Sequence, residues 1–133
     1  MNKLVLFGIL CVCVVAATKP RADSKAKCYA ETDLADLDVR ATIKKSISRP
    51  EPLKQIIAYL ACFMQDRSIL TADGIFDAEV CKKEVRPENA ASANPVIDAC
   101  ASQRGKNALE TTALLLKCLK ERDPKLLEKL DIF

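Results

Sequence analysis

Cysteine constrains this chain more than any other residue type, because the sequence of 133 residues holds seven cysteines and no histidine. Two of the seven lie within residues 1–17, where Lys3 precedes an unbroken apolar run that ends in small residues. This pattern is typical of a secretory signal peptide, and the run is shorter than the ~20 residues that a membrane-spanning helix needs. We therefore expect cleavage after Ala17 and a secreted, extracellular product that keeps five cysteines.

The five remaining cysteines are expected to serve as structural cross-links. An odd number leaves one thiol over once internal disulfides have formed. A catalytic thiolate usually depends on a neighbouring histidine, and this chain has none. Zinc sites usually contain closely spaced pairs, whereas these cysteines stand far apart: Cys28, Cys62, Cys81, Cys100 and Cys118. We accordingly expect no metal, no cofactor and no enzymatic activity.

Residues 18–133 have the size of a single domain, and their apolar positions recur with helical rather than strand spacing. We expect an all-α domain, a compact bundle of about six short helices. Ser24, Asp77 and Asn107 are expected to cap helices, and Gly74 to supply positive φ in a turn. The expected helices are two between Ser24 and Pro50 with a break near residues 33–38, and then about 53–65, 78–85, 95–103, which Ser92–Asn94 introduces, and 108–122.

The charge of the chain is nearly balanced, with a formal net value of +3 and lysines that are offset by nearby acidic residues. This balance argues against a nucleic-acid partner. After the signal peptide, no segment is long and apolar enough to predict stable membrane insertion.

The spacing of four cysteines resembles the pattern of insect pheromone and general odorant-binding proteins. Cys28, Cys62, Cys100 and Cys118 match the first, third, fourth and sixth cysteines of that family. The segments ACFMQ, ILTADGIFD and LETTALLLKCL also resemble family segments, so the resemblance covers residues 24 to about 122. The second and fifth family cysteines fall on Ala58 and Leu109, a paired replacement that resembles the four-cysteine minus-C subgroup.

The resemblance implies a disulfide pattern, because the family bonds its first cysteine to its third and its fourth to its sixth. Cys28 would then pair with Cys62, and Cys100 with Cys118; the sequence by itself leaves other pairings open. Cys81 departs from the family pattern. It shares a helical face with Ala78 and Val85, so it is either a buried free thiol or a link to a second chain.

The resemblance also implies a secreted carrier that binds small hydrophobic ligands, such as odorants, pheromones or fatty acids, in an apolar cavity. Ordinary core packing is the competing interpretation for each candidate lining residue. Because aromatic residues are few, we expect aliphatic ligands, and because histidine is missing, weak pH dependence. The candidate lining residues are Ile57, Leu60, Met64, Ile69, Phe76, Ile97, Thr112, Leu115, Leu116, Leu119 and Phe133.

Several alternatives remain open at this point. The same fold could serve as a non-olfactory carrier in haemolymph, saliva, venom or reproductive fluid. The chain could also be a structural or interaction protein with no cavity, or a saposin-like membrane-active helical protein. The expected partner is a small apolar ligand, with a membrane receptor as a further candidate and a monomer or weak homodimer as the expected state.

Overall fold

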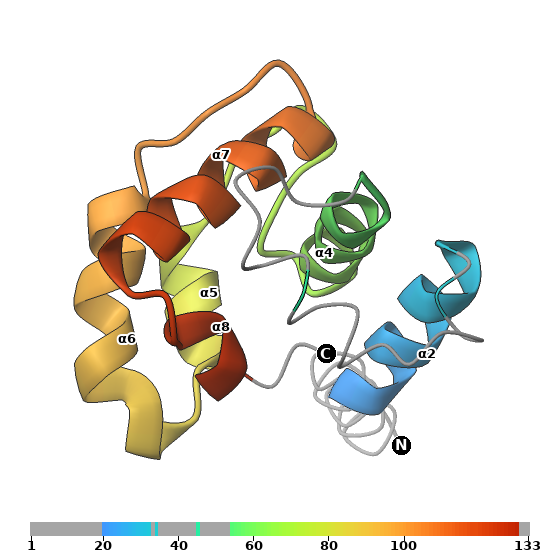
Figure 1. Ribbon diagram of the computed structural model, residues 1–133. Helices are drawn as coiled ribbons and strands as arrows, with labels where there is room; N and C mark the ends of the chain where they lie inside the picture. The colour runs from blue at the N-terminus through green and yellow to red at the C-terminus, as the bar shows by residue number, and fades with distance from the viewer. Residues whose placement is uncertain (1–19, 33, 35–44, 46–53, 131–133) are drawn as a thin grey trace, which may run out of the picture.

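The structure is a computed structural model that describes residues 20–32, 34, 45 and 54–130 (Figure 1). These ranges contain helices and one isolated antiparallel bridge, between Leu70 and Phe76. The expected all-α class is confirmed, with five helices of seven residues or more and the four-residue α8. The second helix expected before Pro50 lies outside the described residues. The helices are α2 (Arg21–Glu31), α4 (Lys54–Asp66), α5 (Ala78–Glu84), α6 (Pro87–Cys100), α7 (Ala108–Arg122) and α8 (Leu126–Lys129).

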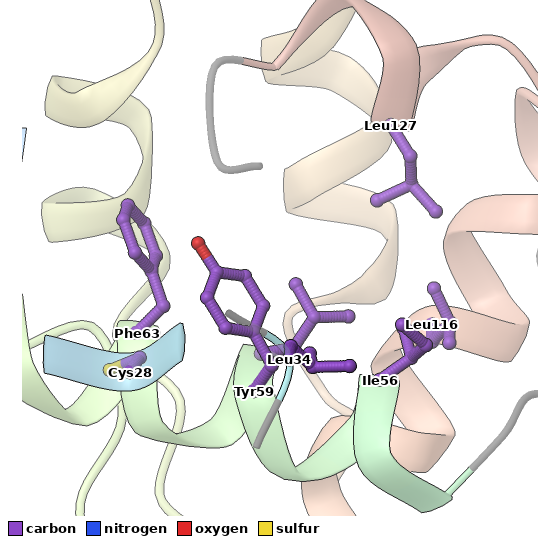
Figure 2. Close-up of a cluster of buried hydrophobic side chains, with 8 residues drawn as sticks. Cys28, Leu34, Ile56, Tyr59, Phe63, Leu116 and Leu127 are labelled. Carbon is purple, nitrogen blue, oxygen red and sulfur yellow. The ribbon is translucent and has the colours of Figure 1, made fainter. Parts of the chain in front are cut away.

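Helix α4 is the central element, because its apolar residues recur at three- and four-residue spacing and form one buried face. Both α2 and α7 pack against it. Figure 2 shows Ile56, Tyr59 and Phe63 in succession along α4, with Leu116 of α7 and Leu127 of α8 on the side that they face. All of these side chains are at most 3% exposed, so this cluster is a closed apolar core.

A second apolar cluster involves α5, α6 and α8. Its buried members are Val85 after α5, Ala93 and Ile97 of α6, and Leu126 of α8. Leu119 of α7 packs against both clusters. Helix α7 therefore joins the two halves of the described core.

Disulfides connect two pairs of helices. Cys28 of α2 is bonded to Cys62 of α4, and their Cα atoms are 5.7 Å apart. Cys100, the last residue of α6, is bonded to Cys118 of α7, with a Cα separation of 5.9 Å. These are the pairs that the resemblance implies. The bridges join residues that are 34 and 18 positions apart in the sequence. Each therefore restricts the conformations of the unfolded chain and thereby stabilises the folded protein.

Two of the expected helix caps are confirmed. The side chain of Asn107 accepts a hydrogen bond from the backbone N–H of Glu110 at 2.9 Å, and that of Asp77 accepts one from Val80 at 3.2 Å. These bonds satisfy amide groups that have no partner within the first turn of a helix.

The expectation that Ser24 caps the first helix is wrong. Helix α2 begins at Arg21 behind Pro20, and Ser24 lies buried within the helix. Its hydroxyl donates a hydrogen bond of 2.6 Å to the carboxylate of Asp66 at the end of α4. The short distance is typical of a hydroxyl bonded to a charged acceptor. The Ser24 side chain therefore bonds to a neighbouring helix instead of capping its own.

The start of the next-to-last long helix also differs from expectation. Helix α6 begins at Pro87 rather than at Pro95, and Pro95 lies inside it. Pro87 occupies the first turn, where proline is well tolerated because its missing N–H would have no partner there. Pro95 is exposed, as is Ala91, whose carbonyl loses the helical bond that an N–H at position 95 would donate. Water can solvate that carbonyl, which lowers the cost of the lost hydrogen bond.

Candidate binding pocket

An apolar pocket lies where α4, the turn after it, and α5 to α8 converge. The space open to the centre of a water molecule is about 70 Å³. Its lining residues are mostly aliphatic and aromatic, and they come from segments far apart in the sequence. They are Arg21, Leu60, Phe63, Met64, Ile69, Phe76, Cys81, Glu84, Val85, Arg86, Ile97, Cys100, Thr112, Leu115, Leu116, Leu119, Leu127 and Leu130.

The structure brings most of the predicted lining residues to this pocket. Leu60, Met64, Ile69, Phe76 and Ile97 line it, together with the α7 residues 112, 115, 116 and 119. Ile57 does not. It is half-buried and packs against the first apolar cluster. Phe133 lies outside the described residues.

The wall that α7 contributes offers little hydrogen bonding to a guest. Thr112 is buried, and its hydroxyl donates a 2.7 Å hydrogen bond to the carbonyl of Ala108 one turn earlier. Leu115, Leu116 and Leu119 follow on the same helix. Most of the pocket surface can therefore interact with a guest only by dispersion and the hydrophobic effect.

The turn between α4 and α5 is fixed against the beginning of α7. Gly74 has a φ of 89°, as the sequence predicts, and its carbonyl accepts a 2.7 Å hydrogen bond from the Thr111 hydroxyl. The same hydroxyl oxygen accepts a bond from the N–H of Gly105 at 2.8 Å. Ile69 and Phe76, at the two ends of this turn, line the pocket. Their positions consequently depend on the bond network at Thr111.

Charged side chains form one part of the pocket lining. Glu84 of α5 accepts three hydrogen bonds from Arg67, at 2.9, 3.0 and 3.1 Å. A single longer contact of 3.3 Å joins Glu84 to Nε of Arg21 in α2. Arg86 follows two residues after Glu84 and also lines the pocket. Arg21, Glu84 and Arg86 are thus the charged residues of the pocket lining.

Cys81 lines the pocket from α5 and is the unbonded member of the described cysteines. Burial, with smaller contributions from the negative charges of Glu84 and Asp77, raises the pKa of its thiol to about 12. A thiol with such a pKa stays protonated near neutral pH and is a poor nucleophile. It therefore acts as part of an apolar wall.

A separate, open groove lies on the other side of α4. It is lined by Ala58, Ala61 and Cys62 of α4 and by Leu109 of α7, among others. Leu109 is 52% exposed. The groove thus brings together Ala58 and Leu109, the two positions that the sequence resemblance aligns with the second and fifth family cysteines.

Sequence reasoning missed the charged lining residues and several apolar ones, among them Phe63, Val85, Leu127 and Leu130. Phe63 and Leu127 carried a usable signal, since each lies in an apolar helical pattern. The charged residues carried no such signal. Charged side chains are mostly solvent-exposed, so the sequence pattern does not show which of them lie beside a pocket.

Within the described ranges, no three histidine, cysteine, aspartate or glutamate side chains come together as a metal site would require. Across the same part of the chain, no helix combines the length and apolar character needed to cross a bilayer.

Comparisons with known proteins agree with this architecture. The sequence profile of the PBP/GOBP family matches residues 15–122. The crystal structure of the odorant-binding protein lmigOBP1 of Locusta migratoria superposes with a TM-score of 0.66, at 23% identity over 80% of each chain. The odorant-binding protein dmelOBP28a of Drosophila melanogaster gives a TM-score of 0.58, at 22% identity over 88% of this chain and 97% of that one. No curated protein sequence matches the chain significantly.

Proposed function

Since the chain belongs to the PBP/GOBP family, we propose that it is a carrier that holds small aliphatic ligands in the apolar pocket between α4 and α8. The observation that carries this proposal is the lining itself, which combines aliphatic walls with a satisfied threonine and a protonated thiol. Such a site supplies binding energy by burial and offers no activated group for chemistry.

The volume of the pocket limits the ligand. The space open to water centres, about 70 Å³, has room for several water-sized groups. We therefore take a short aliphatic tail of about six methylene groups, each of similar size to water, as the expected guest. At about 0.8 kcal/mol per methylene, that tail contributes roughly 5 kcal/mol before association costs. We expect dissociation constants of about a millimolar or weaker for 1-octanol, and longer chains require the pocket to expand.

Calorimetric titration of the mature protein with 1-octanol tests the proposal. Leu115→Phe, which adds volume to the pocket wall, is expected to weaken binding about ten-fold or more, because it fills the space that the tail needs. Leu109→Phe places the same change on the exposed side of the same helix and is the matched control. Wild-type protein that binds no aliphatic compound would favour the alternative of a structural protein, and binding only to intact lipid vesicles would favour the saposin-like alternative.

We further propose that the chain is a four-cysteine, minus-C member of the family. Ala58 and Leu109 line one groove between facing helices, as the two halves of a lost disulfide should. Restoring both cysteines in Ala58→Cys/Leu109→Cys is expected to form that bond, so alkylation without reductant labels one thiol, Cys81. The single variant Ala58→Cys is the control and should label two. Three labelled thiols in the double variant would contradict the assignment.

Export and signal cleavage complete the proposal. The pattern of residues 1–17 and the two disulfides favour an oxidising, extracellular destination. The intact mass of the secreted protein tests it, and a mass that begins at Thr18 is the expected result.

A further inference from the structure

We propose that helix α5 is the movable wall of the pocket, and that a ligand enters and leaves when the ion pairs of Glu84 and Lys82 release this helix. The inference rests on the proposed carrier function and adds its regulation: the rate of ligand exchange depends on ionic strength. Helix α5 contributes Cys81 and Glu84 to the lining and lies beside α6 (Figure 1).

The other walls of the pocket are firmly attached. One disulfide joins α2 to α4, and another joins α6 to α7. Helix α8 is held by burial, because Leu126 and Leu127 lie in the two apolar clusters and are at most 3% exposed. The turn between α4 and α5 is bonded to α7 through the hydroxyl of Thr111. Each of these walls therefore resists displacement.

Helix α5 is attached more weakly than these walls. Among the described helices of seven residues or more, it is the one without a disulfide, since Cys81 is unbonded. None of its own residues is buried, whereas α2, α4, α6 and α7 each bury at least two. Ala78 and Cys81 pack against the second cluster but are only partly buried, and Val85 is buried just beyond the helix. Burial consequently stabilises the position of α5 less than that of its neighbours.

Two charged side chains of α5 connect it to the rest of the fold. Glu84 accepts three hydrogen bonds from Arg67, directly after α4, and one from Arg21 of α2. Lys82 forms an ion pair of 2.9 Å with Asp98 of α6. These contacts tie α5 to α2, to the end of α4 and to α6, so their strength bears directly on whether α5 stays closed.

The ion pairs of α5 are accessible to salt. The side chain of Glu84 is 22% exposed and that of Asp98 is 56% exposed. Lys82 also contacts Glu79 of its own helix at 2.8 Å, and it keeps this partner when Asp98 is released. Salt screens partly exposed pairs of this kind and has no such effect on a disulfide. Ionic strength should therefore loosen α5 more than the cross-linked helices.

The same ion pairs should control rates of ligand exchange more than affinity. They join protein groups to one another, so they hold α5 closed whether the pocket is empty or filled. Weakening them opens both states alike, and a ligand then enters and leaves faster by the same factor. Asp98 gives the clearest test of this point, because it lies outside the lining, whereas Glu84 belongs to it.

Amide hydrogen exchange of the mature protein tests the motion of α5 without a ligand. At about 20 mM NaCl, we expect the amides of residues 81–84 to exchange about ten-fold or more faster than those in the middle of α4 and α7. Raising NaCl to about 500 mM should speed this exchange several-fold and leave α4 within about two-fold. Glu84→Gln should produce a similar increase at low salt. Glu121→Gln, which removes the same charge from an exposed position of α7 outside the lining, should not.

Relaxation-dispersion NMR with 1-octanol tests the link between this motion and binding. Asp98→Asn should raise the dissociation rate of 1-octanol about two- to three-fold, the effect expected for one partly exposed ion pair, and should leave the dissociation constant within about two-fold. Glu121→Gln should change neither quantity.

The outcomes separate this inference from the carrier function. If wild-type protein binds 1-octanol but α5 exchanges its amides as slowly as α4, only this inference fails. It also fails if exchange in α5 responds to neither salt nor Glu84→Gln, or if Asp98→Asn leaves the dissociation rate unchanged. Equal effects in Glu121→Gln would overturn it as well, because they would reflect net charge alone. If wild-type protein binds no aliphatic compound, both proposals fail.

Discussion

Gly74 illustrates, at the scale of a single residue, how backbone conformation positions the pocket. A Cβ atom at this position would lie 2.6 Å from Thr111 Oγ1 and 2.7 Å from the carbonyl oxygen of Asn107. Its φ of 89° is also a conformation that L-residues with side chains rarely adopt. We expect Gly74→Ala to lower the free energy of unfolding by about 2–4 kcal/mol, the sum of backbone strain and overpacking. Urea unfolding measures this, with the exposed neighbour in Asp73→Ala as the control; a loss below 0.5 kcal/mol, taken as roughly the scale of ordinary surface changes, would contradict it.

Cys81 carries the other prediction at this scale. Because burial and nearby negative charge raise the pKa of its thiol from 9.0 to about 12, the native protein holds less of the reactive thiolate at any pH below that value. The lower thiolate fraction slows alkylation, but part of this effect is offset because a more basic thiolate is a better nucleophile. We expect iodoacetamide at pH 8 to label Cys81 about 30-fold or more slowly in the native protein than in urea. Mass spectrometry without reductant should find this one labelled thiol; rapid native labelling, further labelled cysteines or a covalent dimer would count against the assignment.

Helix α6 shows what an element tolerates. Its two prolines differ in context: Pro87 lies in the first turn, and Pro95 lies in the interior, where it removes one helical hydrogen bond. We expect Pro95→Ala to raise the free energy of unfolding by about 1–2 kcal/mol, because the restored bond outweighs the greater freedom that alanine gives the unfolded chain. Pro87→Ala, the matched control, should change it by less than ~0.5 kcal/mol or lower it. Thermal unfolding of both variants measures these stability changes. A destabilised Pro95→Ala would contradict the prediction and show that Pro95 stabilises the helix.

The whole molecule lacks the side chain that most often makes binding pH-dependent. Histidine is the residue whose ordinary pKa falls near pH 6.5, and the sequence contains none. We expect the affinity for uncharged 1-octanol to change less than about two-fold between pH 5.5 and 7.5, measured by calorimetry at constant ionic strength. An uncharged ligand is needed because a carboxylic acid would itself titrate toward the lower end. A change of ten-fold or more would reveal a carboxylate with a strongly raised pKa beside the pocket.

The sequence by itself determined whatever depends on a few neighbouring residues. The amphipathic spacing of α4 and α7, the caps at Asp77 and Asn107, and the positive φ of Gly74 each follow from chemistry within about one helical turn. For the same reason most aliphatic lining residues were predictable, since a residue on the apolar face of a helix must point inward. Whether such a residue lines the pocket was not predictable: Ile57 packs against the first apolar cluster but is not part of the lining.

Only the tertiary structure decided the features that join distant segments. Ser24 bonds to Asp66, 42 residues later in the sequence, instead of capping its own helix, and Arg21 bonds to Glu84, 63 residues later. Pro95 stays helical because its helix packs against the second apolar cluster along the face that holds Ala93 and Ile97. The physical reason is common to all three. Packing between helices decides which polar groups come within hydrogen-bond distance, and its free energy offsets local costs such as a proline inside a helix. This packing energy depends on residues far apart in the sequence, so no local pattern predicts it.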